Sequence, residues 1–199
     1  MHDKIDLWFT CGSTYTTLTL LRLAEVEKRS GTSFNLRPFY LAEILTELGS
    51  WPFPEGSPKT RYMWRDVERR AMMLGLSPNM PLPYPSPKSA LANQVAHVAL
   101  KHAWGRRFLV EMARAWLEDR LMPGSDESLA HCLPAIGQDV EVVLREVERA
   151  DAHKALIAET AEARRLGLFG SPVCVANGEL FWGDDRVEDA IEWANSASS

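Results

Sequence analysis

Cysteine is scarce in this sequence, and its spacing excludes several kinds of site. The chain has three cysteines, Cys11, Cys132 and Cys174, and no Cys-x-x-Cys pair. Dithiol exchange and a thiolate zinc site therefore lack their usual residues, and no disulfide framework is indicated. The five histidines are scattered as well. We expect no structural metal, and a reducing compartment such as the cytoplasm.

Long hydrophobic runs and an excess of basic residues are also missing. No apolar stretch approaches the roughly 20 residues that span a bilayer, and the first residues lack the apolar segment of a signal peptide. The formal net charge is −5, which argues against general affinity for nucleic acids or anionic membranes. A chain of 199 residues suffices for one domain with a sizeable core and an insertion.

What the sequence does contain is a dense series of turn and strand signals near its end. Gly167 ends a helical pattern, and glycine suits the left-handed position that follows a helix. Two short apolar runs, 173–176 and 179–182, flank Asn177-Gly178. That dipeptide is a strong hairpin signal, because both turn positions need a positive φ. The pattern predicts two short strands joined by a tight turn.

The residues on either side of this hairpin carry further signals. Pro172 directly precedes the first run, and a proline there donates no ladder hydrogen bond. Beyond the second run, Asp185 and Glu188 stand three residues apart, which is typical of a capping box at a helix start. Helix, loop, proline, hairpin and capped helix follow one another as in the second half of a thioredoxin-like domain.

The first forty residues predict the other half of that domain. Ile5–Phe9 is short and apolar, Tyr15–Arg29 has apolar residues on more than one helical face, and Phe34–Tyr40 is again strand-like. Strand, helix and strand with a right-handed crossover form the first half of the thioredoxin plan. We therefore expect residues 1–40 and 167–199 to form an α/β domain with a thioredoxin-like fold.

Residues 41–166 predict an all-helical domain inserted between strands two and three. A Pro-rich loop at 50–58 and an extended segment with five prolines at 77–87 interrupt the helical pattern. Short polar residues that suit N-cap positions precede several of the helices. The expected helices span 59–74, 88–104, 105–121, 125–136, 139–150 and 151–166, the last three with N-caps at Ser125, Asp139 and Asp151.

The stretch Gly-Ser-Pro-Val at 170–173, followed by Gly-Glu-Leu-Phe-Trp-Gly-Asp-Asp-Arg at 178–186, resembles one branch of the DsbA-like superfamily. That branch holds the 2-hydroxychromene-2-carboxylate isomerases and the kappa-class glutathione transferases, and the similarity extends, with gaps, over nearly the whole chain. The resemblance implies a glutathione-dependent isomerase of aromatic-compound breakdown, with glutathione transferase activity as a further option. It also implies glutathione as cofactor, a small aromatic substrate and a homodimer.

Ser13 is the residue that the resemblance makes catalytic. It lies between the first strand and the first helix, where thioredoxin-like enzymes keep their reactive centre. Its hydroxyl would donate to the sulfur of glutathione, and together with the positive end of the helix it would favour thiolate over thiol. The plain alternative is an N-cap serine, for which this position is equally suitable.

The Pro-rich loop and the helix after it supply two further ligand residues by resemblance. Lys59 corresponds to a family lysine that meets the glycyl carboxylate of glutathione. Ser50 falls where relatives often have asparagine, and it could hydrogen-bond the peptide with a shorter reach. Without a ligand, Lys59 would be an exposed lysine in a first helical turn, where a positive charge opposes the helix dipole.

The segment around the hairpin supplies the rest of the implied glutathione site. In the family the peptide bond before Pro172 is cis, and the neighbouring backbone pairs with glutathione like an added strand. Ser171 is expected to offer only its backbone groups. Asp184 and Asp185 would hold the γ-glutamyl end, while Arg186 is expected to pair with neighbouring carboxylates.

Two other readings stay open at this level. Cys11, two residues before Ser13, could act as a nucleophile near a helix start in a relative of the thiol-disulfide oxidoreductases, or it could be a small buried cysteine. The sequence departs from the family at Thr14, Ser50 and Lys88. A catalytically silent binding module that kept the fold but lost glutathione therefore remains an alternative. Four aromatic residues could line an electrophile pocket or simply pack: Trp8, Trp51, Tyr84 and Trp182.

Overall fold

A computed structural model describes residues 5–49 and 53–196 of the chain, and its centre is a four-stranded sheet. The strands are β1 (Ile5–Phe9), β2 (Phe34–Pro38), β3 (Val173–Ala176) and β4 (Glu179–Trp182). Their order is β2-β1-β3-β4, with β1 parallel to β2 and β3 antiparallel to both β1 and β4. This is the sheet of a thioredoxin-like fold, as predicted.

The first and the last α-helix of the described chain cover one face of this sheet. In α1 (Thr14–Ser30), Leu23 and Val26 pack against Ile5 and Leu7 of β1, and α9 (Val187–Ser196) adds Val187 and Ile191 to the same cluster. Residues that alternate along β1 point to the opposite face, as the two-residue period of a strand requires. There Trp8 packs with Phe39 and Leu168.

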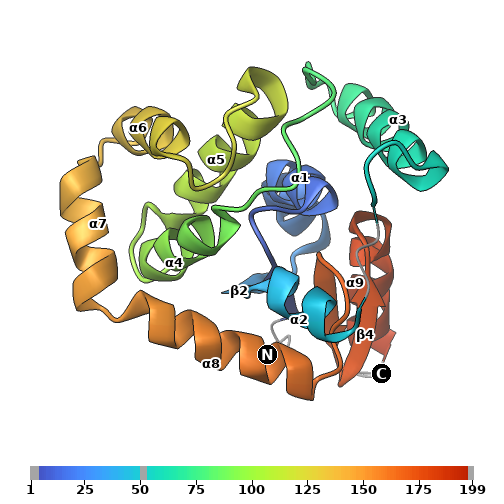
Figure 1. The fold of residues 1–199 in the computed structure, drawn as a ribbon. Helices are drawn as coiled ribbons and strands as arrows, with labels where there is room; N and C mark the ends of the chain where they lie inside the picture. Colours follow the sequence, from blue (N-terminus) through green and yellow to red (C-terminus); the bar gives the residue numbers. More distant parts are fainter. Residues whose placement is uncertain (1–4, 50–52, 197–199) are drawn as a thin grey trace.

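Helices fill the described chain between β2 and β3. They are α2 (Leu41–Glu47), α3 (Pro58–Met73), α4 (Ser89–Ala99), α5 (Gly105–Asp119), α6 (Asp126–Ala135), α7 (Val140–Arg149) and α8 (Ala152–Arg165). Figure 1 shows α5, α6 and α7 following one another along one side of the molecule before the long α8 returns toward the sheet. None of the helices in the described ranges is long and apolar enough to cross a membrane.

Most predicted helix and strand positions agree with the structure, and the hairpin agrees to the residue. Asn177 and Gly178 have φ values of 50° and 80°, as a tight turn of this kind requires. Ser125 and Asp139 cap α6 and α7 through side-chain oxygens that accept backbone N–H groups. Gly167 has a φ of 78° after α8.

Two predicted helix starts are wrong in their capping. Asp151 precedes α8 in a left-handed conformation and makes no side-chain cap hydrogen bond. The capping box between Asp185 and Glu188 does not form, because a short 3₁₀ turn, η1 (Asp184–Arg186), precedes α9, and Glu188 binds Arg22 instead. A long-range ion pair has replaced the local contact.

The helix predicted over 88–104 is shorter than expected and ends at Ala99. The chain then turns tightly, so that Gly105 meets the Ala99 carbonyl group. A Cβ at position 105 would lie only 2.3 Å from the Ala99 oxygen. The turn thus depends on glycine there, because any other side chain would collide with backbone.

Candidate functional site

The start of α1 and the loop before β3 meet at one end of the two central strands, β1 and β3. The Ser13 hydroxyl donates a hydrogen bond of 2.8 Å to the backbone oxygen of Ser171, and it accepts one of 3.3 Å from Thr16 N. The Ser171–Pro172 peptide is cis. Ser13 is therefore an N-cap residue, and it also touches the proline loop. The two proposed roles of this position are compatible.

The side chain of Ser171 is engaged in hydrogen bonds within the fold. Its buried Oγ accepts a hydrogen bond from Thr10 N at 2.9 Å and shares one of 2.7 Å with the Thr16 hydroxyl. These bonds tie the proline loop to the end of β1 and to the first turn of α1. Gly183 N, at the other end of the hairpin, donates to Pro172 O at 2.9 Å.

Asn93 of α4 hydrogen-bonds the segment that follows β1. No sequence pattern identified this residue. This fully buried amide accepts from Cys11 N and donates to the Thr10 hydroxyl and to the Phe39 carbonyl, each at 2.9 Å. A buried polar group left unpaired would be costly, so an asparagine on the mainly Ala and Val face of a buried helix is the signal that could have identified it.

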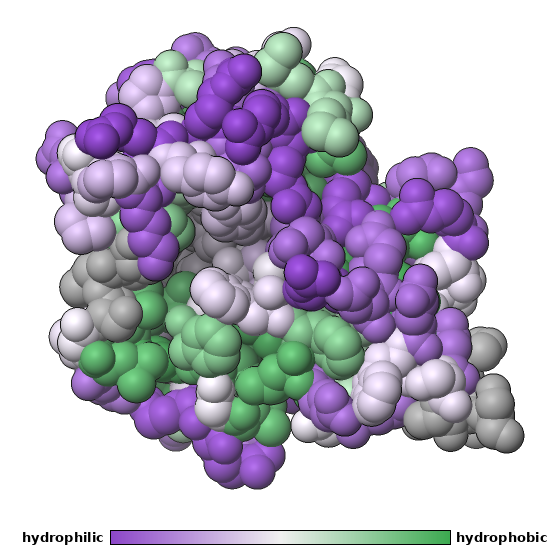
Figure 2. All heavy atoms as spheres, turned by 90° about the vertical axis from the view of Figure 1, so that its right-hand side faces the viewer, coloured by the Kyte–Doolittle hydropathy of each residue, from purple (hydrophilic) through white to green (hydrophobic). Residues whose placement is uncertain are grey.

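A cavity of about 810 Å³ opens beside the contact between Ser13 and Ser171. This size is within the range of small-molecule sites, about 300–1,000 Å³. Figure 2 looks onto the side of the molecule that carries α3, α9 and β4 and shows a hollow with hydrophobic residues gathered below it and hydrophilic ones above. Residues around the cavity include Leu41, Leu45, Phe53, Lys59, Asp66, Arg70, Tyr84, Phe169, Trp182, Asp185 and Arg186.

The residues proposed to bind glutathione take different places around this cavity. Ser13, Lys59, Ser171 and Asp185 line it, whereas Asp184 does not. Ser50 lies outside the described residues, as does Trp51. Lys59 sits in the first turn of α3 with its Nζ 5.6 Å from the centre of the Phe53 ring. Within the described part of the chain, no carboxylate lies within ion-pair distance of Lys59.

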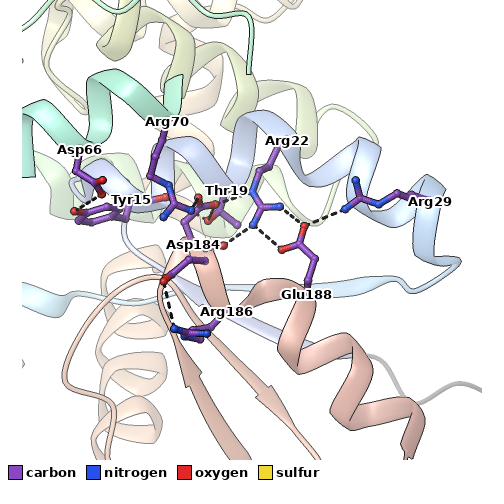
Figure 3. A network of polar contacts seen from close by, with 10 residues as sticks. Tyr15, Thr19, Arg22, Arg29, Asp66, Arg70, Asp184, Arg186 and Glu188 are labelled. Atoms are coloured by element: carbon purple, nitrogen blue, oxygen red, sulfur yellow. Dashed lines mark hydrogen bonds and ion pairs between the residues drawn. The ribbon is translucent and has the colours of Figure 1, made fainter. Parts of the chain in front are cut away.

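Asp184 is a structural ion-pair centre rather than a cavity residue. Its side chain is 2% exposed, and its carboxylate accepts from Arg22 Nε and the Thr19 hydroxyl at 2.8 Å each, and from Arg70 Nη2. Figure 3 shows Arg22 between Asp184 and Glu188. A buried charge needs such compensation. Because these bonds occupy both carboxylate oxygens, we remove Asp184 from the predicted ligand residues.

Asp185 and Arg186 differ from Asp184 in their exposure. Both side chains are 53% exposed, and the Arg186 guanidinium lies 3.6 Å from the Asp185 carboxylate and 2.7 Å from that of Asp189. Arg186 therefore pairs with its neighbours, as expected from the sequence. The Asp185 carboxylate lines the cavity with Arg186 as its ion-pair partner, and at 53% exposure it is still accessible to a cationic ligand group.

A tyrosine and a carboxylate on opposite helices form a polar contact at the cavity wall. The Tyr15 hydroxyl of α1 donates to the Asp66 carboxylate of α3 at 3.1 Å. Burial, followed by the negative charge of Asp66, raises the pKa of Tyr15 well above its ordinary value. Tyr15 thus remains protonated at neutral pH, and its proton is held by Asp66.

Cys11 does not reach the cavity. The residue is 5% exposed and belongs to a core cluster that includes Phe9 of β1 and residues of α4 and α5. Burial raises the pKa of the Cys11 thiol to about 12, so that almost no thiolate exists at neutral pH. The structure therefore supports the buried-cysteine interpretation over the nucleophile. Trp8 is also fully buried away from the cavity, whereas Tyr84 and Trp182 line it.

The chain is similar in sequence and in fold to known proteins. The sequence profile of the DSBA-like thioredoxin domain matches residues 4–192. A 2-hydroxychromene-2-carboxylate isomerase of Sphingobium xenophagum is 23% identical over 191 residues, which cover 94% of this chain and 96% of that protein. A solved structure of 2-hydroxychromene-2-carboxylate isomerase superposes with a TM-score of 0.79 at 20% identity, with 98% of both chains covered.

A more distant structure carries a thiol ligand. The cytosolic disulfide reductase DsbM from Pseudomonas aeruginosa, solved with GSH, has a TM-score of 0.60 to this chain at 16% identity. The superposition covers 98% of this chain and 97% of DsbM. Both solved structures share the fold with this chain over nearly its full length.

Proposed function

The chain belongs to the DSBA-like thioredoxin domain family, and on that premise we propose that it is a glutathione-dependent isomerase. Its substrate would be an aromatic-degradation intermediate of the 2-hydroxychromene-2-carboxylate kind, the compound in the name of the similar Sphingobium protein. Glutathione transfer to such an electrophile is the second outcome that the same site would permit. The free thiols of all three cysteines suit a cytoplasmic enzyme.

One observation carries the proposal. The Ser13 hydroxyl stands at the N-terminus of the 17-residue helix α1 and beside the Ser171 backbone, on the wall of a cavity of about 810 Å³. The first turn of α1 contains no acidic residue. A helix N-terminus and a hydroxyl donor together stabilise an anion, and a thiolate is the anion that this chemistry needs.

The residues around the cavity fit glutathione. Lys59 offers an ammonium group for the glycyl carboxylate, and Asp185 offers a carboxylate for the γ-glutamyl ammonium group. The backbone of Ser171 offers an N–H and a carbonyl to the middle of the peptide, as in strand addition. Asp184 takes no part, because Arg22 and Arg70 already neutralise it.

When bound, glutathione would supply a thiolate that adds reversibly to an activated double bond, so that rotation becomes free before the thiol leaves. The protein would orient and desolvate the reactants. Phe169 and Trp182 meet edge to face, with ring centres 4.9 Å apart, and with Tyr84 they give the cavity an aromatic wall suited to a flat electrophile. Ser13 would stabilise the sulfur as a thiolate before addition and again when it leaves.

Thiolate absorbance tests the role of Ser13 directly. Titration of the wild-type protein with glutathione near neutral pH should show thiolate absorbance, and Ser13→Ala should lose most of it while still binding the peptide. Ser13→Thr is the matched control, because it keeps the hydroxyl and the capping ability. Equal thiolate fractions in wild type and Ser13→Ala would remove Ser13 from the proposal.

Substrate conversion tests the activity itself. Wild type should isomerise 2-hydroxychromene-2-carboxylate only when glutathione is present, and calorimetry should show glutathione binding. If calorimetry shows no heat at millimolar glutathione, the chain is a silent module with this fold. If glutathione binds but this substrate is untouched, the thiol site stands and the electrophile differs.

A further inference from the structure

The Ser13 proton is already used in a hydrogen bond within the protein. A carbonyl oxygen can only accept, so in the 2.8 Å contact with Ser171 O the proton must lie on Ser13 and point at the carbonyl. The Ser13 hydroxyl oxygen also accepts a hydrogen bond from Thr16 N. In this arrangement Ser13 turns only a lone pair toward the cavity, and a lone pair repels a thiolate.

The Ser171 backbone is also incompletely paired. Its carbonyl is held by Ser13, and its N–H has no hydrogen-bond partner among the described residues. The side chain is locked by Thr10 and Thr16 and cannot turn to help. The loop therefore presents the Ser171 N–H as a free donor and the Ser171 carbonyl as an acceptor that Ser13 occupies. These are the two groups with which an added strand would pair.

We propose that Ser171 makes this site selective for thiols carried on a peptide, because a ligand N–H must take the Ser171 carbonyl before the Ser13 hydroxyl can turn to a sulfur. The proposal rests on the glutathione-dependent function proposed above and refines its specificity. A peptide thiol brings its own N–H and releases Ser13. A small thiol such as 2-mercaptoethanol brings none, and Ser13 stays bound to Ser171.

The exchange leaves no protein group without a hydrogen-bond partner that had one before. Before binding, Ser13 O–H pairs with Ser171 O, and Ser171 N–H is unpaired. After binding, the ligand N–H and C=O pair with Ser171, and Ser13 O–H pairs with the sulfur. Only the hydroxyl proton needs to swing, since Ser13 Oγ can keep its bond from Thr16 N and its place as N-cap. Thus α1 stays capped throughout.

Two ligands test whether the hydrogen bond between Ser13 and Ser171 controls which thiols are ionised. The first is a glutathione analogue in which an ester oxygen replaces the N–H between γ-glutamate and cysteine. With wild-type protein, its bound thiol should show a thiolate-to-thiol ratio at least about tenfold below that of bound glutathione, because one pKa unit corresponds to a tenfold ratio. The readout is thiolate absorbance of the saturated complexes across pH.

The second ligand is S-methylglutathione, which has the peptide N–H but no ionisable thiol. Since Ser13 competes with the ligand for Ser171 O, Ser13→Ala should bind S-methylglutathione at least as tightly as wild type does by calorimetry. A loss of more than about tenfold in Ser13→Ala would overturn the proposal, because the hydroxyl would then contact the ligand peptide itself. This arm stands even if the ester analogue fails to bind.

The outcomes distinguish this inference from the proposed function. If wild type binds glutathione and ionises it, and ionises the ester analogue or 2-mercaptoethanol equally well, the Ser171 proposal is wrong and the glutathione site stands. If wild type neither binds nor ionises glutathione, the proposed function is wrong and this inference is lost with it.

Discussion

At the scale of single residues, burial decides which sulfur or oxygen can do chemistry. Ser13 and Cys11 are two positions apart, yet only Ser13 lines the cavity. Both follow β1, which ends at Phe9, and the chain turns between them, so that Cys11 packs in the core. The sequence alone left both in play, since position relative to a helix start does not reveal which side chain faces inward.

The Cys11 thiol is expected to be almost inert in the native protein. With its pKa raised to about 12, its thiolate fraction at pH 7 should be more than about a thousandfold below that of free cysteine. Cys132 and Cys174 are also buried, with pKa values raised to about 12 by desolvation. Alkylation followed by mass spectrometry should label none of them quickly at pH 7, and all three in denaturant. Rapid native labelling of Cys11 would revive the nucleophile interpretation.

At the scale of secondary-structure elements, Asp184 shows what sequence reasoning could not supply. The adjacent acids Asp184 and Asp185 looked alike in the sequence, and both were assigned to the ligand. In the structure η1 buries one and exposes the other. Their difference depends on Arg22 of α1 and Arg70 of α3, which are distant in sequence and give no local signal.

Substituting each acid in turn separates these roles. Asp184→Ala should destabilise the protein by about 3 kcal/mol, since it leaves Arg22 and Arg70 partly buried without their carboxylate. Asp185→Ala should change stability by less than about 0.5 kcal/mol, because it is an exposed substitution. Urea unfolding measures both.

Glutathione affinity should show the reverse order. Asp185→Ala removes the carboxylate proposed to meet the ligand ammonium group, and it should weaken glutathione binding roughly tenfold by calorimetry. Asp184→Ala, measured where it remains folded, should retain most affinity if η1 keeps its shape. Equal losses of stability in the two variants would contradict the assignment of Asp184 as the ion-pair centre.

At the scale of the whole molecule, local signals specified the fold, and long-range contacts made the site. The hairpin, the proline and the helix caps are short-range features, so the sequence predicted the order of elements and most boundaries. The cavity draws on α1, α2, α3, the segment with two further cis prolines at 81 and 85, and the hairpin. Only the folded chain brings these together, and Asn93 and Arg70 were missed for that reason.

Because the cavity joins segments from both ends and the middle of the chain, a ligand there should stabilise the protein as a unit. Glutathione at a hundred times its dissociation constant adds about 2.7 kcal/mol to the unfolding free energy. For a protein of this size, about 1 kcal/mol raises the melting temperature by about 2–4 °C, which gives a rise of about 5–11 °C. Thermal unfolding at increasing glutathione concentrations measures it.

The size of that rise also reports which contacts the ligand makes. S-methylglutathione should raise the melting temperature comparably, because it keeps the glycyl carboxylate for Lys59 and the peptide groups for the Ser171 backbone. The small thiol 2-mercaptoethanol should leave it unchanged, since it brings neither a peptide N–H nor a charge. A rise with 2-mercaptoethanol equal to that with glutathione would mean that sulfur alone is recognised, and the peptide-binding half of the site would then have no role.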